Sequence, residues 1–232
     1  MISPNISDRI LFEDNHLIVI NKLPSEIVQG DKTGDQPLSD LVKKYIKEKY
    51  NKPGEVFLGV VHRIDRPVGG AVIFARTSKA LSRMNELIKQ RKVKKTYWAI
   101  VKNKPPKNEG ELIHYLRRDQ KKNKSFVYEK KVENSKEAKM TFKVIGKSND
   151  YYLIQVNLIT GRHHQIRAQL SKIGSPIKGD LKYGFNRSNK DASISLHARS
   201  IEFVHPVKKE NITIMANPPE DILWNFFLKD FS

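Results

Sequence analysis

The most chemically dense segment of the sequence is His62-Arg63-Ile64-Asp65-Arg66, which is followed by Gly69 and Gly70. The carboxylate between two arginines is expected to stay ionised, because a nearby cation favours the charged form. An ionised, well-held aspartate is suited to act as a nucleophile rather than as a general acid. A surface ion pair that fixes the loop would give the same pattern, so the segment alone leaves both interpretations open.

A second dense segment runs from Thr160 through Gly161-Arg162-His163-His164-Gln165-Ile166-Arg167. A helix is expected over 163–173, closed by Gly174. His163 and Arg167 are four residues apart and would then share one helical face. The adjacent histidines admit a metal site, although the pair of histidines four apart with a glutamate between them is missing. The other interpretation is a helix N-terminus whose N–H groups are satisfied by polar side chains.

Short apolar strands are expected to position these two segments. The first segment lies between strands predicted over 57–61 and 71–75, and further helices are expected after Pro37, from Ser78 as N-cap and after Pro219. The last helix is expected to bury Ile222, Leu223, Phe226 and Phe227. Other strands are predicted over 9–14, 16–22, 96–101, 111–116, 125–131, 138–145, 151–158, 195–204 and 212–215. Because many strands follow one another without a helix, we expect antiparallel pairing and an α+β fold.

The composition excludes several classes of protein. There is no cysteine, which excludes disulfides, thiolate zinc sites and a cysteine nucleophile. No apolar run approaches the ~18 residues that cross a bilayer, and the N-terminus lacks the features of a secretory signal. A soluble, cytoplasmic protein is therefore expected.

The charge suggests a polyanionic partner. Lysine and arginine number 43 against 25 acidic residues, giving a net charge of +18 spread along the chain. A basic surface on a folded domain is typical of nucleic-acid binding, although a well-solvated, lysine-rich surface would look the same. An anionic membrane fits less well, because no long basic amphipathic helix is present.

Several separated motifs resemble the RluA-type pseudouridine synthases in order and spacing. They are His62-Arg63-Ile64-Asp65, Lys95-Thr96-Tyr97 and Gly161–Arg167. The stretches 10–24 and Gly179-Asp-Leu-Lys-Tyr-Gly are similar to that family as well. The resemblance implies one catalytic domain over 9–232, a short N-terminal extension over 1–8 and no S4 RNA-binding domain. It also implies a mixed, mostly antiparallel sheet with flanking helices and loops and a central catalytic cleft.

The resemblance assigns roles by position. It implies that Asp65 attacks the uridine so that the base detaches, turns and rejoins through carbon. Tyr97 would pack against the base and assist proton removal, and Arg167 would pair with the aspartate. A tyrosine in an apolar strand is usually a core residue, so only the resemblance favours Tyr97 as a site residue. The polar residues expected to contact substrate are His62, Arg63, Arg66, Arg162, His164 and Gln165. No metal and no organic cofactor is implied.

The expected partner is ribosomal or transfer RNA, with no membrane, no obligate protein partner and a monomeric state. An arginine such as Arg63 can fill the space left by a flipped base, and unstacking that base costs a few kcal/mol. The departures from the family at Pro67-Val68-Gly69-Gly70 and His163 bear on substrate choice. Two alternatives stay open: an RNA-binding protein without activity, and a glycosidic hydrolase, which would need a second carboxylate ~5–5.5 Å from Asp65.

Overall fold

The computed structural model describes residues 5–231, and its contacts divide the chain into two compact units. The first holds the chain up to Val93 together with Ala198–Pro218, and the second holds Lys94–His197 and the chain from Pro219. The expected single domain over 9–232 stays a prediction. Of the expected N-terminal extension, residues 1–4 lie outside the described residues, and Ile6–Arg9 form a short 3-10 helix. No helix within residues 5–231 is long and apolar enough to cross a membrane.

The first unit is built on a sheet with the strand order β1-β2-β4-β10. These strands are β1 (Ile10–Glu13), β2 (Leu17–Lys22), β4 (Gly69–Ala75) and β10 (Leu196–Val204), the last of which belongs to this unit from Ala198 on. The short β3 (Gly59–Val60) pairs with β4, and β11 (Asn211–Met215) pairs with β10. The β1–β2, β2–β4, β3–β4 and β10–β11 pairs are antiparallel, which agrees with the predicted α+β class.

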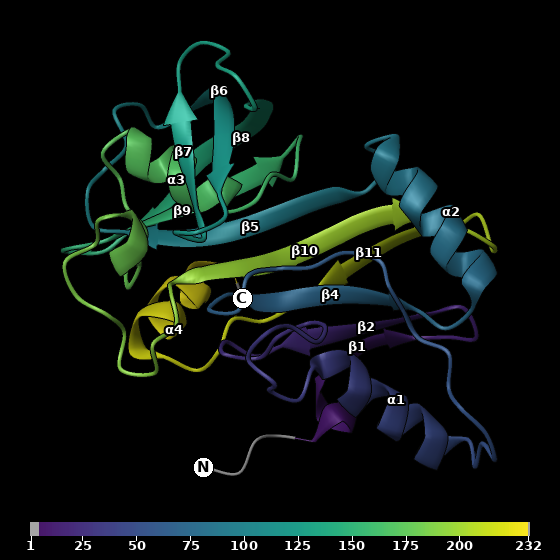
Figure 1. Cartoon of the computed structure of the whole chain (residues 1–232). Helices are drawn as coiled ribbons and strands as arrows, with labels where there is room; N and C mark the ends of the chain where they lie inside the picture. The colour runs from purple at the N-terminus through teal and green to yellow at the C-terminus, as the bar shows by residue number, and fades with distance from the viewer. Residues whose placement is uncertain (1–4, 232) are drawn as a thin grey trace. The chain divides into compact units, whose positions relative to one another are not determined.

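Helices cover both faces of this sheet, which explains why residues 17–20 of β2 and the whole of β4 are apolar. Alternate residues of β2 and β4, such as Ile18 and Phe74, pack on α1 (Leu38–Lys49), which lies along β1 and β2 in Figure 1. The intervening residues, such as Ile73, pack on α2 (Ser78–Lys89). With both faces buried, β4 is a firm base for the loop that leads into it, residues 61–68.

The helix α2 begins one residue away from the expected cap. Thr77, rather than Ser78, is the N-cap, and its Oγ1 accepts a hydrogen bond from the Ala80 N–H at 3.1 Å. Ser78 is the first helical residue. Both hydroxyl side chains can cap a helix, so the sequence alone did not distinguish them.

The second unit contains a five-stranded antiparallel sheet with the order β5-β9-β8-β6-β7. The strands are β5 (Lys94–Val101), β9 (Tyr152–Leu158), β8 (Lys136–Lys147), β6 (Glu109–Asp119) and β7 (Lys124–Tyr128). The helix α3 (Gln165–Lys172) packs on the face that carries Leu116 and Ala138. On the opposite face, α4 (Ile222–Leu228) covers Trp98 and Ile100.

The start of α3 also differs from the prediction. The helix expected over 163–173 starts at Gln165, because His164 lies in the left-handed region with φ 53° and acts as its N-cap. His163 therefore precedes the helix and does not share a helical face with Arg167. The left-handed Gly174 that follows the helix is confirmed, with φ 82°.

The inward face of α4 also differs from the prediction. Trp224 and Phe227 are its buried residues, whereas Ile222 is 91% exposed and Phe226 is 46% exposed. Asp221 caps the helix through the N–H groups of Leu223 and Trp224. Ile222 and Phe226 are four residues apart and share the outward face of α4.

A buried lysine fastens the loop between β3 and β4 to the end of β2. Lys22 is 1% exposed, and its Nζ donates to the carbonyls of Leu23 and Glu26 at 2.8 Å and of Arg66 at 3.1 Å. The Arg66 carbonyl also accepts from the Ser25 N–H at 2.9 Å. Burial lowers the pKa of Lys22 to about 7. The backbone carbonyl of Arg66, the residue after Asp65, is thus held by the Lys22 side chain and by the Ser25 N–H.

Replacing Lys22 with Met should lower the free energy of unfolding by about 2–4 kcal/mol, because buried carbonyls lose their donor. Methionine keeps most of the volume, so the lost polar contacts dominate the change. Urea unfolding measures the difference. Lys47→Met, on the exposed side of α1, is the matched control and should leave the midpoint unchanged. Equal midpoints for Lys22→Met and the wild type would show that this ammonium group does not hold the loop.

The same lysine predicts a pH dependence of stability. Its pKa of about 7 in the folded protein lies below its ordinary value of 10.5, so the unfolded chain binds the additional proton between these limits. The free energy of unfolding of the wild type should therefore gain a contribution as the pH rises from about 7 toward 10. Lys22→Met should lack that gain when both proteins are unfolded at pH 7 and pH 9. Parallel pH profiles for the two proteins would contradict this assignment.

Candidate active site

The loop that carries Asp65 is braced on both sides within the first unit. His62 Nε2 accepts a hydrogen bond from the Ile73 N–H of β4 at 3.2 Å. Ile64 packs against the apolar cluster under α1. His62 and Ile64, the two direct neighbours of Arg63, contact the protein, whereas Arg63 itself is exposed. The segment therefore presents Arg63 and the half-buried Asp65 on a fixed backbone.

A tight turn follows Asp65. The Val68 N–H donates to the Asp65 carbonyl at 3.0 Å. Gly70 has φ 116°, and a Cβ there would lie 2.6 Å from the Ala198 backbone nitrogen. Only glycine meets both demands, since the left-handed φ strains other residues and the neighbouring strand leaves no space. The departure from the family pattern at 67–70 is thus compatible with a closely fitted turn.

Arg66 has a carboxylate partner within the first unit. Its Nη2 lies 2.6 Å from Asp35 Oδ2, and both side chains are exposed. The hydrogen bond from Arg66 holds the pKa of Asp35 below its ordinary value. The side chain of Arg66 therefore ties the loop 31–36 to the Asp65 loop, a role in addition to the expected contact with substrate, which stays a prediction.

In the second unit, Arg167 forms a buried two-pronged ion pair with Asp180. Nε lies 2.7 Å from Oδ2 and Nη2 lies 2.9 Å from Oδ1, the parallel geometry that guanidinium and carboxylate groups favour. The guanidinium also lies 5.1 Å from the ring centre of Tyr183. Sequence reasoning did not name Asp180 as a site residue. Its place in the Gly179-Asp-Leu-Lys-Tyr-Gly motif was the available signal.

The two adjacent histidines connect the start of α3 to β7. His163 and His164 stack with ring centres 3.7 Å apart, and His163 Nδ1 lies 2.9 Å from Ser125 Oγ. His164 Nδ1 lies 3.0 Å from the Tyr183 hydroxyl. Burial, with a smaller effect from Arg167, lowers the pKa of His164 to about 2, so this imidazole is neutral at physiological pH.

The remaining polar residues of this motif form hydrogen bonds with nearby backbone groups and with the Thr160 side chain. Gln165 Oε1 accepts from Thr160 Oγ1 at 2.8 Å and from the Arg162 N–H at 3.0 Å, and its Nε2 donates to the Lys139 carbonyl. Arg162 Nε donates to the Glu137 carbonyl at 2.8 Å. These bonds fix the loop that enters α3. The expected contacts of Arg162, His164 and Gln165 with RNA stay predictions.

Tyr97 lies on the sheet face that α3 covers. In the register, Tyr97 is opposite Val156, and Val156 is opposite Phe142 on β8. Tyr97 is 7% exposed, so it belongs to the core of this face as well as to the predicted site. Lys95, two residues earlier, shares the same face of β5, and burial lowers its pKa.

Each unit thus gathers part of the predicted site. The first places His62, Arg63, Asp65 and Arg66 on one loop, and the second gathers Arg162, His164, Gln165 and Arg167 at the start of α3. The pairing of Asp65 with Arg167 joins residues of the two units and stays a prediction. Among residues 5–231, no group of three or more histidine, aspartate or glutamate side chains could hold a metal ion.

Comparison with known proteins gives a consistent result. A family profile described as RNA pseudouridylate synthase matches residues 16–172. A ribosomal large subunit pseudouridine synthase C of Buchnera aphidicola is 33% identical over 97% of this chain and 71% of its own length. An uncharacterized RNA pseudouridine synthase of Bacillus subtilis is 32% identical over 92% of this chain and 69% of its own length.

A solved structure shares the fold. It is the structure titled human RNA pseudouridylate synthase domain containing 4. The match covers 96% of this chain and 93% of the human chain, with a TM-score of 0.78 and 24% sequence identity. The match of the family profile covers both the Asp65 loop and the Arg167 helix. From the profile and from the identity along nearly the whole chain, this protein belongs to the RNA pseudouridylate synthase family and is an RNA pseudouridine synthase, an isomerase.

Proposed function

We propose that this enzyme converts uridine to pseudouridine in the RNA of the large ribosomal subunit, with Asp65 as its nucleophile. The observation that carries the proposal is the Asp65 loop, whose backbone is fixed by Lys22 and His62 while Arg63 stays exposed beside it. The ribosomal substrate is favoured over transfer RNA by the name of the Buchnera relative.

The reaction conserves every atom of the substrate. The bond from the ribose C1′ to N1 of the base breaks, a bond from C1′ to C5 forms, and the proton on C5 is replaced by one on N1. The Asp65 carboxylate attacks the target uridine and frees the base to turn. Neither an oxidant nor a transferred group is needed, so side chains and water can supply all of the chemistry.

The other residues prepare the substrate. Arg63 enters the space left by the flipped uridine, a role that requires a long, exposed side chain such as this one. Tyr97 packs against the base and assists removal of the C5 proton. Arg167 pairs with the nucleophile, and its orientation is set in advance by Asp180.

Asp65→Asn tests the nucleophile. The amide keeps the size of the side chain but cannot replace the carboxylate, so pseudouridine formation on ribosomal RNA should fall below detection. RNA affinity should stay equal or rise slightly, since one negative charge is removed. Pseudouridine content, the dissociation constant and a thermal melt are measured together. Asp150→Asn, in an exposed turn of the second unit, is the control and should behave as the wild type.

A folded Asp65→Asn variant that still forms pseudouridine would disprove the catalytic assignment. A wild-type protein that binds RNA tightly and modifies neither ribosomal nor transfer RNA would instead support an RNA-binding protein without activity.

Arg63→Ala should slow modification of a structured RNA much more than modification of an unpaired strand. The cost of extracting the base, a few kcal/mol, arises mainly in the structured substrate. Initial rates on a folded hairpin and on an unpaired oligonucleotide of the same sequence give the comparison, with Arg187→Ala in an exposed loop as control. Equal losses on both substrates would place Arg63 in another step.

A further inference from the structure

The sheet of the second unit leaves part of one face open. The helix α3 covers the face that carries Leu116 and Ala138, and α4 covers the β5 end of the opposite face through Trp98. At the β6–β7 end of that opposite face, the outward side chains stay partly or fully exposed, and Ile113 is 47% exposed.

The open end carries aromatic and basic side chains on neighbouring positions. Tyr115 of β6 is directly opposite Tyr128 of β7, and Arg117 is opposite Phe126. The Arg117 guanidinium lies 5.3 Å from the ring centre of Tyr128. Lys122, in the turn before β7, and Lys124, the first residue of β7, have their Nζ atoms 5.9 and 6.0 Å from the centre of the Phe126 ring. The Nζ atom of Lys124 also lies 5.1 Å from the centre of the Tyr183 ring. We call this surface the hairpin platform, and it consists of Tyr115, Arg117, Lys122, Lys124, Phe126 and Tyr128.

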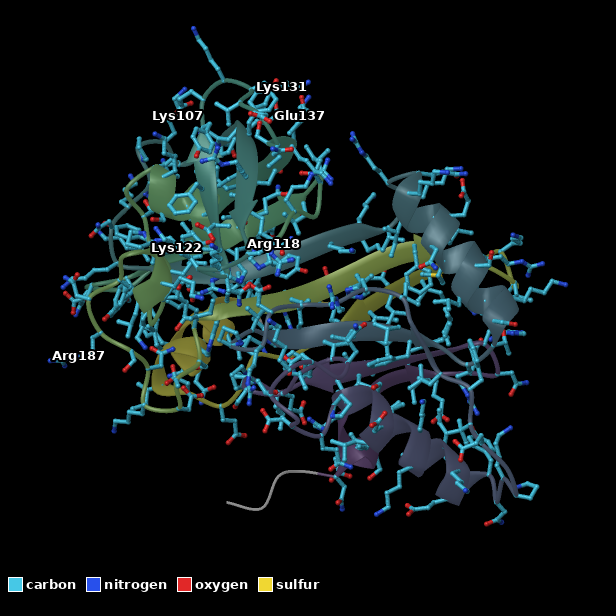
Figure 2. All side chains as sticks on the ribbon, in the orientation of Figure 1. Lys107, Arg118, Lys122, Lys131, Glu137 and Arg187 are labelled. Carbon is cyan, nitrogen blue, oxygen red and sulfur yellow. The ribbon has the colours of Figure 1, made fainter. Side chains whose placement is uncertain are left out.

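The charges of the platform differ from those of the adjacent sheet surface. Farther along β8, Lys143 lies 3.5 Å from Glu109 and Lys139 lies 3.6 Å from Glu137. Among the described residues, the three cations of the platform contact aromatic rings and form no ion pair with a carboxylate. Figure 2 shows Arg118 and Lys122 at the end of the β6–β7 hairpin where β7 begins, and Arg118, opposite Ser125, belongs to the other face of the sheet.

The hairpin formed by β6 and β7 is hydrogen-bonded to other segments of the second unit through Ser125 and the turn before β7. Ser125 Oγ donates to the His163 carbonyl at 2.7 Å, and the Ser125 N–H donates to the Tyr183 hydroxyl at 2.8 Å. Lys182 Nζ donates to the Asn123 carbonyl at 3.1 Å. These bonds join the hairpin to the segments that hold Arg167. The platform is therefore preorganised, and little ordering entropy is lost when a ligand binds it.

We propose that the hairpin platform binds a single-stranded segment of the RNA substrate through base stacking and phosphate contacts. This proposal rests on the proposed function, because it assigns part of the same RNA to a surface outside the catalytic residues. Aromatic rings next to unpaired cations match a ligand that alternates flat bases with phosphates.

The spacing of the rings favours single-stranded over duplex RNA. Phe126 and Tyr128 are two residues apart on one strand, which separates them by about 6.6 Å. Stacked bases in a duplex lie about 3.4 Å apart, so bases that use both rings must be unstacked from each other. Unpaired loops and internal bulges supply such bases.

The test uses the full chain and a 12-nucleotide uridine-rich RNA, single-stranded or annealed to its complement. The double variant Phe126→Leu/Tyr128→Leu removes both rings but keeps apolar side chains in the strand. Its affinity for the single strand should fall by at least about fivefold, while its affinity for the duplex changes little. On ribosomal RNA, KM should rise with kcat unchanged. Ile113→Ala, on the same face of the neighbouring strand, is the matched control and should leave both values unchanged.

The variant Phe126→Trp/Tyr128→Trp keeps the stacking surface and should retain wild-type affinity even if the leucine variant melts at a lower temperature. Lys122→Gln/Lys124→Gln should weaken binding and reduce its salt dependence, because two phosphate contacts are lost. Unchanged single-strand affinity in the leucine variant, or an equal loss in Ile113→Ala, would overturn the platform. A wild-type protein that forms no pseudouridine would instead overturn the proposed function.

Discussion

The placement of Asp65 depends on a lysine, Lys22, that is buried beneath its loop. An ammonium group without compensation costs several kcal/mol to bury, so Lys22 is tolerated only where acceptors replace water. The acceptors are the carbonyls of residues 23, 26 and 66, and the last of these is available only when the loop has its observed conformation. Burial of Lys22 and placement of the Asp65 loop therefore stabilise each other. When it is protonated, Lys22 also interacts electrostatically with Asp65, which favours its charged form.

The second unit also buries a basic side chain, Arg167, and compensates it with polar partners. Arg167 is buried with Asp180 in a two-pronged ion pair, and a neutral His164 hydrogen-bonds the Tyr183 that lies against the guanidinium. The pair fixes the plane of the guanidinium before any substrate binds. In both units, buried polar contacts orient a charged group. The free-energy cost of ordering that group is therefore met when the protein folds and not when the substrate reacts.

The elements with strong apolar patterns were predictable from the sequence. β2 and β4 contain continuous apolar runs because both of their faces are buried. The apolar residues of α1 recur at helical spacing because only one of its faces is buried. The late start of α3 was not predictable, because a left-handed conformation is uncommon for histidine and the Tyr183 hydroxyl beside its ring is distant in sequence. Lys22 was missed because lysine is almost never fully buried. The hairpin platform could not be predicted without the register of β6 and β7, since a slip of one residue would move its rings to the opposite face of the sheet.

The central claim is that this chain isomerises uridines of large-subunit ribosomal RNA, and pseudouridine mapping tests it most directly. Total RNA from cells with and without the gene is mapped at single-nucleotide resolution, and the purified protein is then added to the unmodified transcript without any cofactor. We expect specific pseudouridines of the large-subunit RNA to be missing without the gene and to be restored at the same positions by the protein. An identical map in both cells, or a loss confined to transfer RNA, would contradict the claim.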